Sequence, residues 1–453
     1  MDDRMMQPSR RVASRRAFRP LIGHFLLTLL AVDAGAQQVG GTSVSSGRGF
    51  YNQPIDVAVR TSTAGATVRY TLDGSDPTSS SNYAEGLAPV TVRIDPASTN
   101  GVLRRLTPAV TLRAYAYKQG MTPSAVDTQT YVFVDRVLTQ TRPSGYPTGF
   151  EYDMDAVVVN DPRYQSRIRN DLLSVPSISV VTSLNDMFGT NSLMTAPASS
   201  IEKPGSIAVI HPDGRSGVQA NCGFKPHSHI LRKRSLRVYF RGAVYGVGAL
   251  HHDLFPDAIE GVDARVRRFD VLVLRAGVND NLQSSFDGRN GRATYVVDQL
   301  ARSSQAAMSG YGQRGLFAHL YINGLYWGLY NLAERPDDAF SAGQFGGDER
   351  DWFAINHAGE LSGDSAWFTG LVNNSWDWNV VRQRLDVPSF ADYILYYFLS
   401  GGGDWPDNNW YAGNRVLPTP GLVRYYIWDI EDSWIRMPGR ANDGAWVHPN
   451  LIA

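Results

Sequence analysis

Cysteine is almost missing from this sequence of 453 residues, and Cys222 is the only one. A single cysteine excludes any disulfide bond within the chain. Residues 221–224 (NCGF) carry none of the local signatures of a catalytic cysteine. We therefore expect Cys222 to be buried and unreactive.

A net charge is also missing, because 43 Lys and Arg residues balance 43 Asp and Glu residues. This balance argues against a general nucleic-acid-binding protein and against a protein held on a membrane surface by a basic patch. Any phosphate-binding site must therefore be local. With 43% hydrophobic and 19% charged residues, the composition is that of a globular protein long enough for two or three domains.

Long hydrophobic runs are missing after residue 36, so we expect no membrane span in the rest of the chain. Before that point, six arginines precede an apolar run at residues 21–32, and the small residues 34–36 (AGA) follow. This order is typical of a cleavable signal peptide over residues 1–36, with the mature chain beginning near Gln37. The apolar run is shorter than the roughly 20 residues that a membrane anchor, the alternative interpretation, needs.

Residues 14–18 (SRRAF) also fit the twin-arginine export pattern, which delivers folded proteins. That route and the ordinary export route both stay open. Either one predicts a secreted, periplasmic or cell-surface protein.

Alternating hydrophobic and polar residues predict short strands at residues 55–59, 67–71, 90–94 and 110–116. Strands of this length and spacing indicate a β-sandwich over residues 42–135. Asp73 and Asp76 lie in a segment rich in turn-forming residues between the second and third strands. We interpret them as turn formers rather than catalytic acids.

The segments 70–78 (YTLDGSDPT) and 112–116 (LRAYA), with Ser124 before the last strand, resemble the immunoglobulin-like module at the C-terminus of chitobiases and β-hexosaminidases. In those enzymes the module is an accessory. The resemblance therefore implies an all-β fold but no sugar cleavage.

Residues 136–174 read as a linker and lead-in, with a segment rich in Thr, Pro and Gly near its start. From residue 175 to residue 453, strand and helix patterns mix. Strands are predicted at 175–181, 235–240, 269–275 and 424–430, helices at 295–307 and 390–399, and a hairpin around Asn323-Gly324. This order indicates a second domain of the α+β class.

The residues with the densest chemistry lie near the end of the sequence. Asp404 precedes Asn409 by five positions, and Asp429 follows at the end of a predicted strand. A carboxylate that orients a hydroxyl, with an amide and a second carboxylate that hold divalent cations, is what metal-assisted phosphoryl transfer needs. Asp and Asn are also common in loops, so a purely structural turn is the alternative on these residues alone.

Several separated segments resemble the CotH (spore-coat) family of secreted atypical kinases, in the order of that family. These are residues 233–240 (KRSLRVYF), 274–280 (LRAGVND), 321–337 (YINGLYWGLYNLAERPD), 401–410 (GGGDWPDNNW) and 428–431 (WDIE). The resemblance implies an α+β atypical protein-kinase-like domain over residues 175–453. It also implies ATP with Mg²⁺ or Mn²⁺ as cofactors and a secreted or cell-surface protein as the substrate.

The resemblance assigns a role to each matching residue. Asp404 matches the catalytic-loop aspartate, and Asn409 and Asp429 match the metal ligands. Lys233 and Arg234 are equal candidates for contact with the nucleotide phosphates. Glu334 matches an acidic family position that would pair with the basic residue.

Two departures from the family bear on these expectations. Residues 226–229 (PHSH) replace a glycine-rich stretch of many relatives, which leaves the loop over the phosphates undefined. The two histidines in this segment invite a zinc interpretation, but no third ligand stands at a suitable spacing. The sequence also ends 24 residues after Asp429, earlier than in most relatives, which fits a truncated domain.

Three function classes remain after the sequence is read. The leading hypothesis is a secreted kinase that transfers the γ-phosphoryl group of ATP to Ser or Thr of an exported or surface protein. The alternative is a non-catalytic surface or coat protein with a kinase-like scaffold. Carbohydrate hydrolysis is the weakest hypothesis, because no spaced pair of acids stands out for it and the tryptophans sit in strand and turn motifs typical of core packing.

Overall fold

The computed structural model describes residues 37–99, 104–229, 231–255, 268–282, 293–402, 405–431 and 433. The predicted signal peptide and Asp404 lie outside these residues. The described residues from Gln38 onward form one compact unit. None of the helices in the described part is long and apolar enough to cross a membrane.

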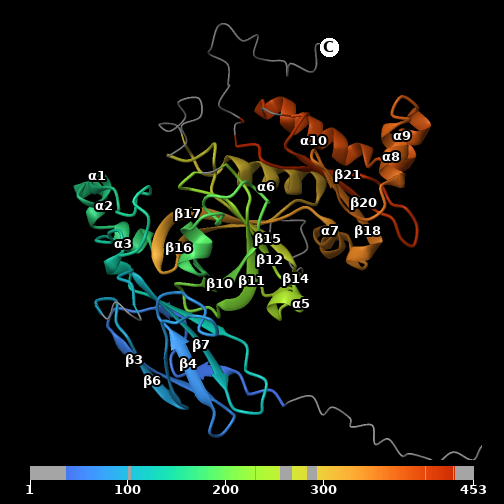
Figure 1. Cartoon of the computed structure of the whole chain (residues 1–453). Helices are drawn as coiled ribbons and strands as arrows, with labels where there is room; N and C mark the ends of the chain where they lie inside the picture. Colours follow the sequence, from blue (N-terminus) through green and yellow to red (C-terminus); the bar gives the residue numbers. More distant parts are fainter. Residues whose placement is uncertain are drawn as a thin grey trace, which may run out of the picture. The chain divides into compact units, whose positions relative to one another are not determined.

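The N-terminal region is a sandwich of two β-sheets (Figure 1). The three-stranded sheet has the order β1-β3-β6, and the five-stranded sheet has the order β2-β8-β7-β4-β5. The strands are β1 (Thr42–Val44), β2 (Gly49–Phe50), β3 (Ile55–Thr61), β4 (Thr67–Thr71), β5 (Ala84–Leu87), β6 (Val90–Ile94), β7 (Ala109–Tyr117) and β8 (Asp127–Val132). All four strands predicted from alternation in this region are present. Their inward side chains, such as Val57, Val68 and Val92, are fully or almost fully buried together.

The predicted turn formers of the sandwich make the expected local hydrogen bonds. Asp73 Oδ1 accepts from the backbone N–H of Ser75 at 3.0 Å. Asp76 Oδ1 accepts from the backbone N–H of Thr78 at 2.9 Å. These bonds confirm a structural role for both aspartates in the turn.

Strands β7 and β8 are buried on both faces. The core of the sandwich accounts for only one of these faces. The face away from that core packs on the second domain, where Val132 lies in one apolar cluster with Ile210 and Tyr321. Polar contacts reinforce this packing, since the Thr130 and Ser179 hydroxyl oxygens lie 2.8 Å apart. The sandwich is therefore docked on its neighbour.

Residues 136–174, which read as a linker in the sequence, contain three short helices, and a fourth ends at their first residue. These are η1 (Val134–Arg136), α1 (Ala156–Val159), α2 (Pro162–Gln165) and α3 (Ile168–Asp171). Tyr146 and Tyr152 between them are buried against Trp327 and Phe188 of the second domain. This segment is packed rather than extended between domains.

A closed β-barrel forms the first half of the second domain, with the strand order β10-β11-β12-β15-β17-β16-β9. Its strands are β9 (Ser177–Val181), β10 (Lys203–Ile210), β11 (Val218–Pro226), β12 (Leu236–Tyr239), β15 (Val271–Arg275), β16 (Gly315–Ile322) and β17 (Leu325–Glu334). The predicted hairpin joins the last two, and both of its turn residues have positive φ, 47° at Asn323 and 82° at Gly324. Cys222 is buried in the barrel core, as expected, and burial raises the pKa of its thiol well above the ordinary value.

A four-stranded antiparallel sheet with helices around it forms the second half (Figure 1). Its order is β19-β18-β20-β21, with β18 (Trp352–Asn356), β19 (Gly359–Ser362), β20 (Trp410–Arg415) and β21 (Arg424–Ile427). The helices are α6 (Val297–Ser309), α7 (Asp338–Phe345), η3 (Glu349–Asp351), α8 (Ala366–Val372), α9 (Trp378–Arg384) and α10 (Val387–Ser400). The remaining elements are α4 (Leu184–Phe188), α5 (Gly242–Tyr245), β13 (Leu250–His251) and β14 (Arg268–Phe269).

Helix α10 shows why this region folds as it does. Asp386 precedes the helix, and its side chain accepts from the backbone N–H of Ser389. Gly401 ends the helix in the left-handed conformation that a helix C-terminus favours. Buried tyrosines of α10 pack against Ala301 of α6 and Ile427 of β21. The chain is thus multi-domain, and its N-terminal region is β-rich and consistent with an immunoglobulin-like module.

Candidate functional site

A pocket of about 830 Å³ opens between the outer face of the barrel and the four-stranded sheet. Arg237 and Arg275 line it from the barrel strands β12 and β15. Asn409, Tyr411 and Asp429 line it from the sheet and its edge. Cationic side chains thus come from one wall, and oxygen-bearing side chains that suit a cation come from the other.

The sheet register explains why Asn409 and Asp429 meet. Trp410, the first residue of β20, pairs with Ile427, the last residue of β21. The residue before β20 and the residues after β21 therefore share one edge of the sheet. The Asn409 side-chain amide donates to the backbone carbonyl of Asp429 at 3.0 Å. Two residues predicted to act together are thus adjacent, although 20 positions separate them.

Both residues have left-handed backbone conformations, with φ of 62° at Asn409 and 55° at Asp429. Residues other than glycine adopt this conformation at a cost that the surrounding structure must offset. The Tyr397 hydroxyl on α10 helps to fix this edge, because it donates to the carbonyl of Asn409 at 2.7 Å. Positions that hold such a conformation cluster at functional sites.

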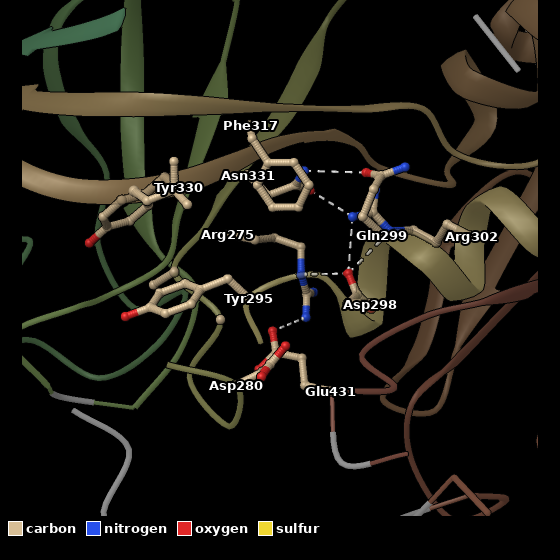
Figure 2. Close-up of a pocket in the computed structure, with 13 residues that line it drawn as sticks. Arg275, Asp280, Tyr295, Asp298, Gln299, Arg302, Phe317, Tyr330, Asn331 and Glu431 are labelled. Carbon is tan, nitrogen blue, oxygen red and sulfur yellow. Dashed lines mark hydrogen bonds and ion pairs between the residues drawn. The ribbon is translucent and has the colours of Figure 1, made fainter. Parts of the chain in front are cut away.

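Arg275 joins the two walls through a chain of ion pairs, and Figure 2 shows those with Asp298 and Glu431. Its Nη2 atom lies 2.5 Å from Asp429 Oδ1 and 2.6 Å from Glu431 Oε1. Its Nε atom lies 3.0 Å from Asp298 Oδ2 on α6, and Arg302 pairs with the same carboxylate at 3.1 Å. Because the Arg275 side chain is buried, these carboxylates hold it as a cation and fix its position.

The carboxylates of this network differ in exposure. The side chain of Asp429 is 40% exposed on the pocket, whereas that of Glu431 is 4% exposed. Burial raises the pKa of Glu431 to about 7, against the attraction of Arg275. Burial also disfavours a charged Asp298, but Arg275 and Arg302 outweigh it and lower the pKa of that carboxyl. Asp429 is therefore the member of the network that a bound ion can reach.

Lys233, a predicted phosphate contact, lies apart from the residues that line the large pocket. Its Nζ atom donates to the carbonyl of Leu329 at 2.6 Å and lies 4.9 Å from the ring centres of Tyr295 and Tyr330. The residue is 5% exposed. Burial and then the charge of Arg232 lower the pKa of Lys233 to about 7.

Arg234, the other predicted phosphate contact, is a pocket-lining residue whose guanidinium is bound to the backbone. It donates to the carbonyls of Leu193 at 2.9 Å, Ala196 at 2.5 Å and Ser228 at 3.2 Å. The residue is 2% exposed, so its surroundings already occupy its donors. These contacts fix the loop before β12.

Glu334 has Arg314 as its partner instead of Lys233 or Arg234. Arg314 Nη2 lies 2.6 Å from Glu334 Oε1, and both side chains are almost fully buried. The carboxylate also accepts from the Arg314 backbone N–H at 2.7 Å. Glu334 therefore closes the junction between β16 and β17 and does not line the pocket.

Arg237 and His227 are pocket residues that sequence reasoning did not assign. Arg237 lies on β12, where Leu236 and Val238 point into the barrel and Arg237 points out. The strict alternation of residues 235–240 was a signal for this orientation. His227 follows β11, and its ring centre lies 6.0 Å from that of Trp428.

A divalent cation fits the Asn409–Asp429 edge by its donor types. An ionised carboxylate and an amide oxygen are ligands that Mg²⁺ and Mn²⁺ accept. Among the described residues, no group of three or more His, Cys, Asp or Glu side chains is placed to hold a metal ion. Asp404, the remaining predicted acid, lies outside the described residues.

Comparison with known families gives two matches along the chain. Residues 46–128 match the chitobiase/beta-hexosaminidase C-terminal domain. Residues 263–370 match the family described as CotH kinase protein. Both resemblances expected from the sequence are confirmed, in the expected order. No curated protein matches the chain.

The CotH match covers only part of the candidate site. Arg275 and Asp298 lie inside the matched residues. Asn409 and Asp429 lie after them. The match therefore suggests an atypical kinase that uses ATP. The assignment of Asn409 and Asp429 to the candidate site depends on their positions in the structure.

Proposed function

We propose that this protein is a secreted atypical kinase that transfers the γ-phosphoryl group of ATP to Ser or Thr of an exported or surface protein. The observation that carries the proposal is the meeting of Asn409 and Asp429 at one sheet edge, facing a pocket with arginines on its opposite wall. The CotH match over residues 263–370 supports the reaction class and the use of ATP.

In this proposal, Asp429 and Asn409 hold the divalent cation, Mg²⁺ or Mn²⁺. One carboxylate oxygen of Asp429 pairs with Arg275, and the side chain remains partly exposed to the pocket. When bound, the cation neutralises charge on the phosphates and on the group in transfer. The ion pair with Arg275 would fix the position of the Asp429 carboxylate and leave its other oxygen for that cation.

Asp404 orients the acceptor hydroxyl in this proposal. It stands five positions before Asn409, as the catalytic aspartate of a kinase loop does relative to its metal-binding asparagine. The signal peptide predicted over residues 1–36 supports a substrate outside the cytoplasm.

The test uses residues 37–453, titrated with ATP and Mn²⁺ in a calorimeter and assayed for transfer of labelled phosphate. We expect Asp429→Asn and Asp429→Ala to abolish metal-dependent binding. Asp404→Ala should leave binding largely intact and lower transfer by roughly 10² to 10⁴-fold, since it acts on the transition state. Asn409→Ala should fall between them.

Asp407→Ala is the matched control, because Asp407 is an exposed carboxylate of the same loop. It should change neither binding nor transfer. Equal losses for this control and for Asp429→Asn would show that the loop, rather than the metal ligand, was disturbed.

The second candidate is a surface or coat protein with a kinase-like scaffold that binds partners without catalysis. The close ion pair between Arg275 and Asp429 favours it, because this cation already neutralises the carboxylate that a metal would use. The two candidates differ in one result. A wild-type chain that binds no nucleotide with either metal supports the scaffold and ends the kinase proposal.

A further inference from the structure

We infer that Arg237, with His227 beside it, forms the subsite that binds the phosphate chain of the nucleotide. This inference rests on the proposed function and deepens it. It places the phosphate contact on the outer face of the barrel, three or four residues after the two basic positions that the family resemblance suggests.

The first step is the direction of the Arg237 side chain. Arg237 pairs in register with Val273 on the neighbouring strand β15. Val273 packs in one cluster with Tyr411 and Trp428 of the second sheet. The barrel face that carries Arg237 is therefore the face that meets the Asn409–Asp429 edge across the pocket.

The second step is the lack of a partner for Arg237. Within the described residues, the Arg237 side chain makes no ion pair or hydrogen bond, and its Nε atom is buried without a partner. Arg275 has three carboxylates, and Arg234 has three backbone carbonyls. Arg335 pairs with Asp337 at 3.5 Å. The Arg237 side chain lines the pocket with its Nε donor buried and unused, so an anion that enters the pocket is the expected partner.

The third step is the field around His227. Burial lowers the pKa of His227 well below its ordinary value, and the charges of Arg237, Arg275 and Arg335 act in the same direction. The Nδ1 atom of this neutral ring is buried without a hydrogen-bond partner among the described residues. This wall of the pocket thus combines the unpaired guanidinium of Arg237 with two buried nitrogen atoms, Arg237 Nε and His227 Nδ1, that have no hydrogen-bond partner among the described residues.

These features indicate which class of ligand the pocket can bind. A guanidinium presents five donors in a planar fork that matches phosphate oxygens. Asp429 on the facing wall suits a divalent cation, which binds phosphate oxygens in turn. A metal-bound nucleoside di- or triphosphate supplies both partners, whereas a nucleoside without phosphates supplies neither.

The experiment compares Arg237→Met and Arg237→Lys with wild type in residues 37–453. Calorimetry with ATP, ADP and adenosine in the presence of Mn²⁺ gives the affinities. We expect Arg237→Met to weaken ATP binding roughly ten- to hundredfold, the usual effect of losing hydrogen bonds to a charged group. Arg237→Lys should recover part of this loss, and any binding of adenosine should not change.

Arg241→Met is the matched control. Arg241 lies four residues further along, is 44% exposed and pairs with Glu202 at 3.1 Å. It does not line the pocket, so nucleotide affinity should stay at the wild-type value. The unfolding midpoint of Arg237→Met should be no lower than that of wild type, because Arg237 has no partner to lose. A lowered midpoint would indicate a structural role and contradict the inference.

The wild-type titration separates the two ways to fail. If wild type binds ATP and Arg237→Met binds it equally well, the phosphate subsite is elsewhere and the proposed function stands. If wild type binds no nucleotide, the proposed function fails and the inference falls with it.

Discussion

Lys233 is a buried amine without a carboxylate partner among the described residues. One backbone carbonyl and two tyrosine rings surround its Nζ atom. Burial lowers its pKa to about 7, so a large part of these side chains is neutral at physiological pH. At the scale of single residues, the basic positions at the start of β12 thus have different environments, and Arg237 is the one that meets the pocket as an unpaired cation.

A pH titration of stability tests this environment of Lys233. The unfolded lysine has an ordinary pKa near 10.4, so between pH 7 and pH 9 the unfolded state binds more protons than the folded state. Stability of the wild type should therefore rise with pH across this window, by roughly 2 kcal/mol relative to Lys233→Met. Urea unfolding at pH 7, 8 and 9 measures the difference. Parallel curves for the two proteins would mean that Lys233 stays charged in the folded state.

At the scale of elements, two strand pairs decide the architecture. The β20–β21 register brings Asn409 to Asp429, and the two-sided burial of β7 and β8 joins the sandwich to the barrel. The sandwich also has a complete core of its own, with Val57, Val92 and Tyr131 fully or almost fully buried within it. A separate sandwich should therefore fold but leave an apolar face uncovered.

We predict that a fragment of residues 38–135 shows β-type circular dichroism and cooperative unfolding, and that it self-associates. Val132 on the uncovered face normally packs with Ile210 and Tyr321. Val132→Thr should reduce the association measured by sedimentation and should destabilise the full chain by about 1 to 3 kcal/mol. A fragment without any unfolding transition would show that its core depends on the barrel. A fragment that stays monomeric at high concentration would contradict the uncovered face.

Sequence patterns predicted the elements whose alternation is clean. The strands around Val57, Val92 and Val238 follow a period of two, and the Asn323-Gly324 turn has a specific chemistry. Strand β10 was missed because its second half is buried on both faces and reads as a continuous apolar run. Strand β20 was not predicted, because its polar residues and its glycine interrupt the alternation of hydrophobic and polar residues that marks a strand.

The site was predictable in part, for a related reason. The spacing of Asp404, Asn409 and Asp429 fits a metal-assisted site or a structural turn, and the family resemblance favoured the metal site. The structure brings Asn409 and Asp429 together. The role of Arg275 was not predictable, because its partner Asp429 lies 154 positions away in the sequence. Only the closure of the barrel against the second sheet creates that contact.

At the scale of the whole molecule, the chain has no net charge, but its charges are unevenly distributed around the large pocket. The pocket between the barrel and the four-stranded sheet has arginines on one wall and an accessible carboxylate on the other. Such a pocket suits a ligand that carries both positive and negative charge, as a metal-bound nucleotide does. None of the described sandwich residues lines this pocket.

The most direct test of the central claim is a crystal structure of residues 37–453 grown with Mn²⁺ and a non-hydrolysable ATP analogue. Manganese is located by its anomalous scattering, independently of the fitted protein. We predict a manganese peak at bonding distance from the Asp429 carboxylate, with the phosphates between it and Arg237. A nucleotide bound outside this pocket, or a pocket that binds nucleotide with no metal at Asp429, would contradict the account.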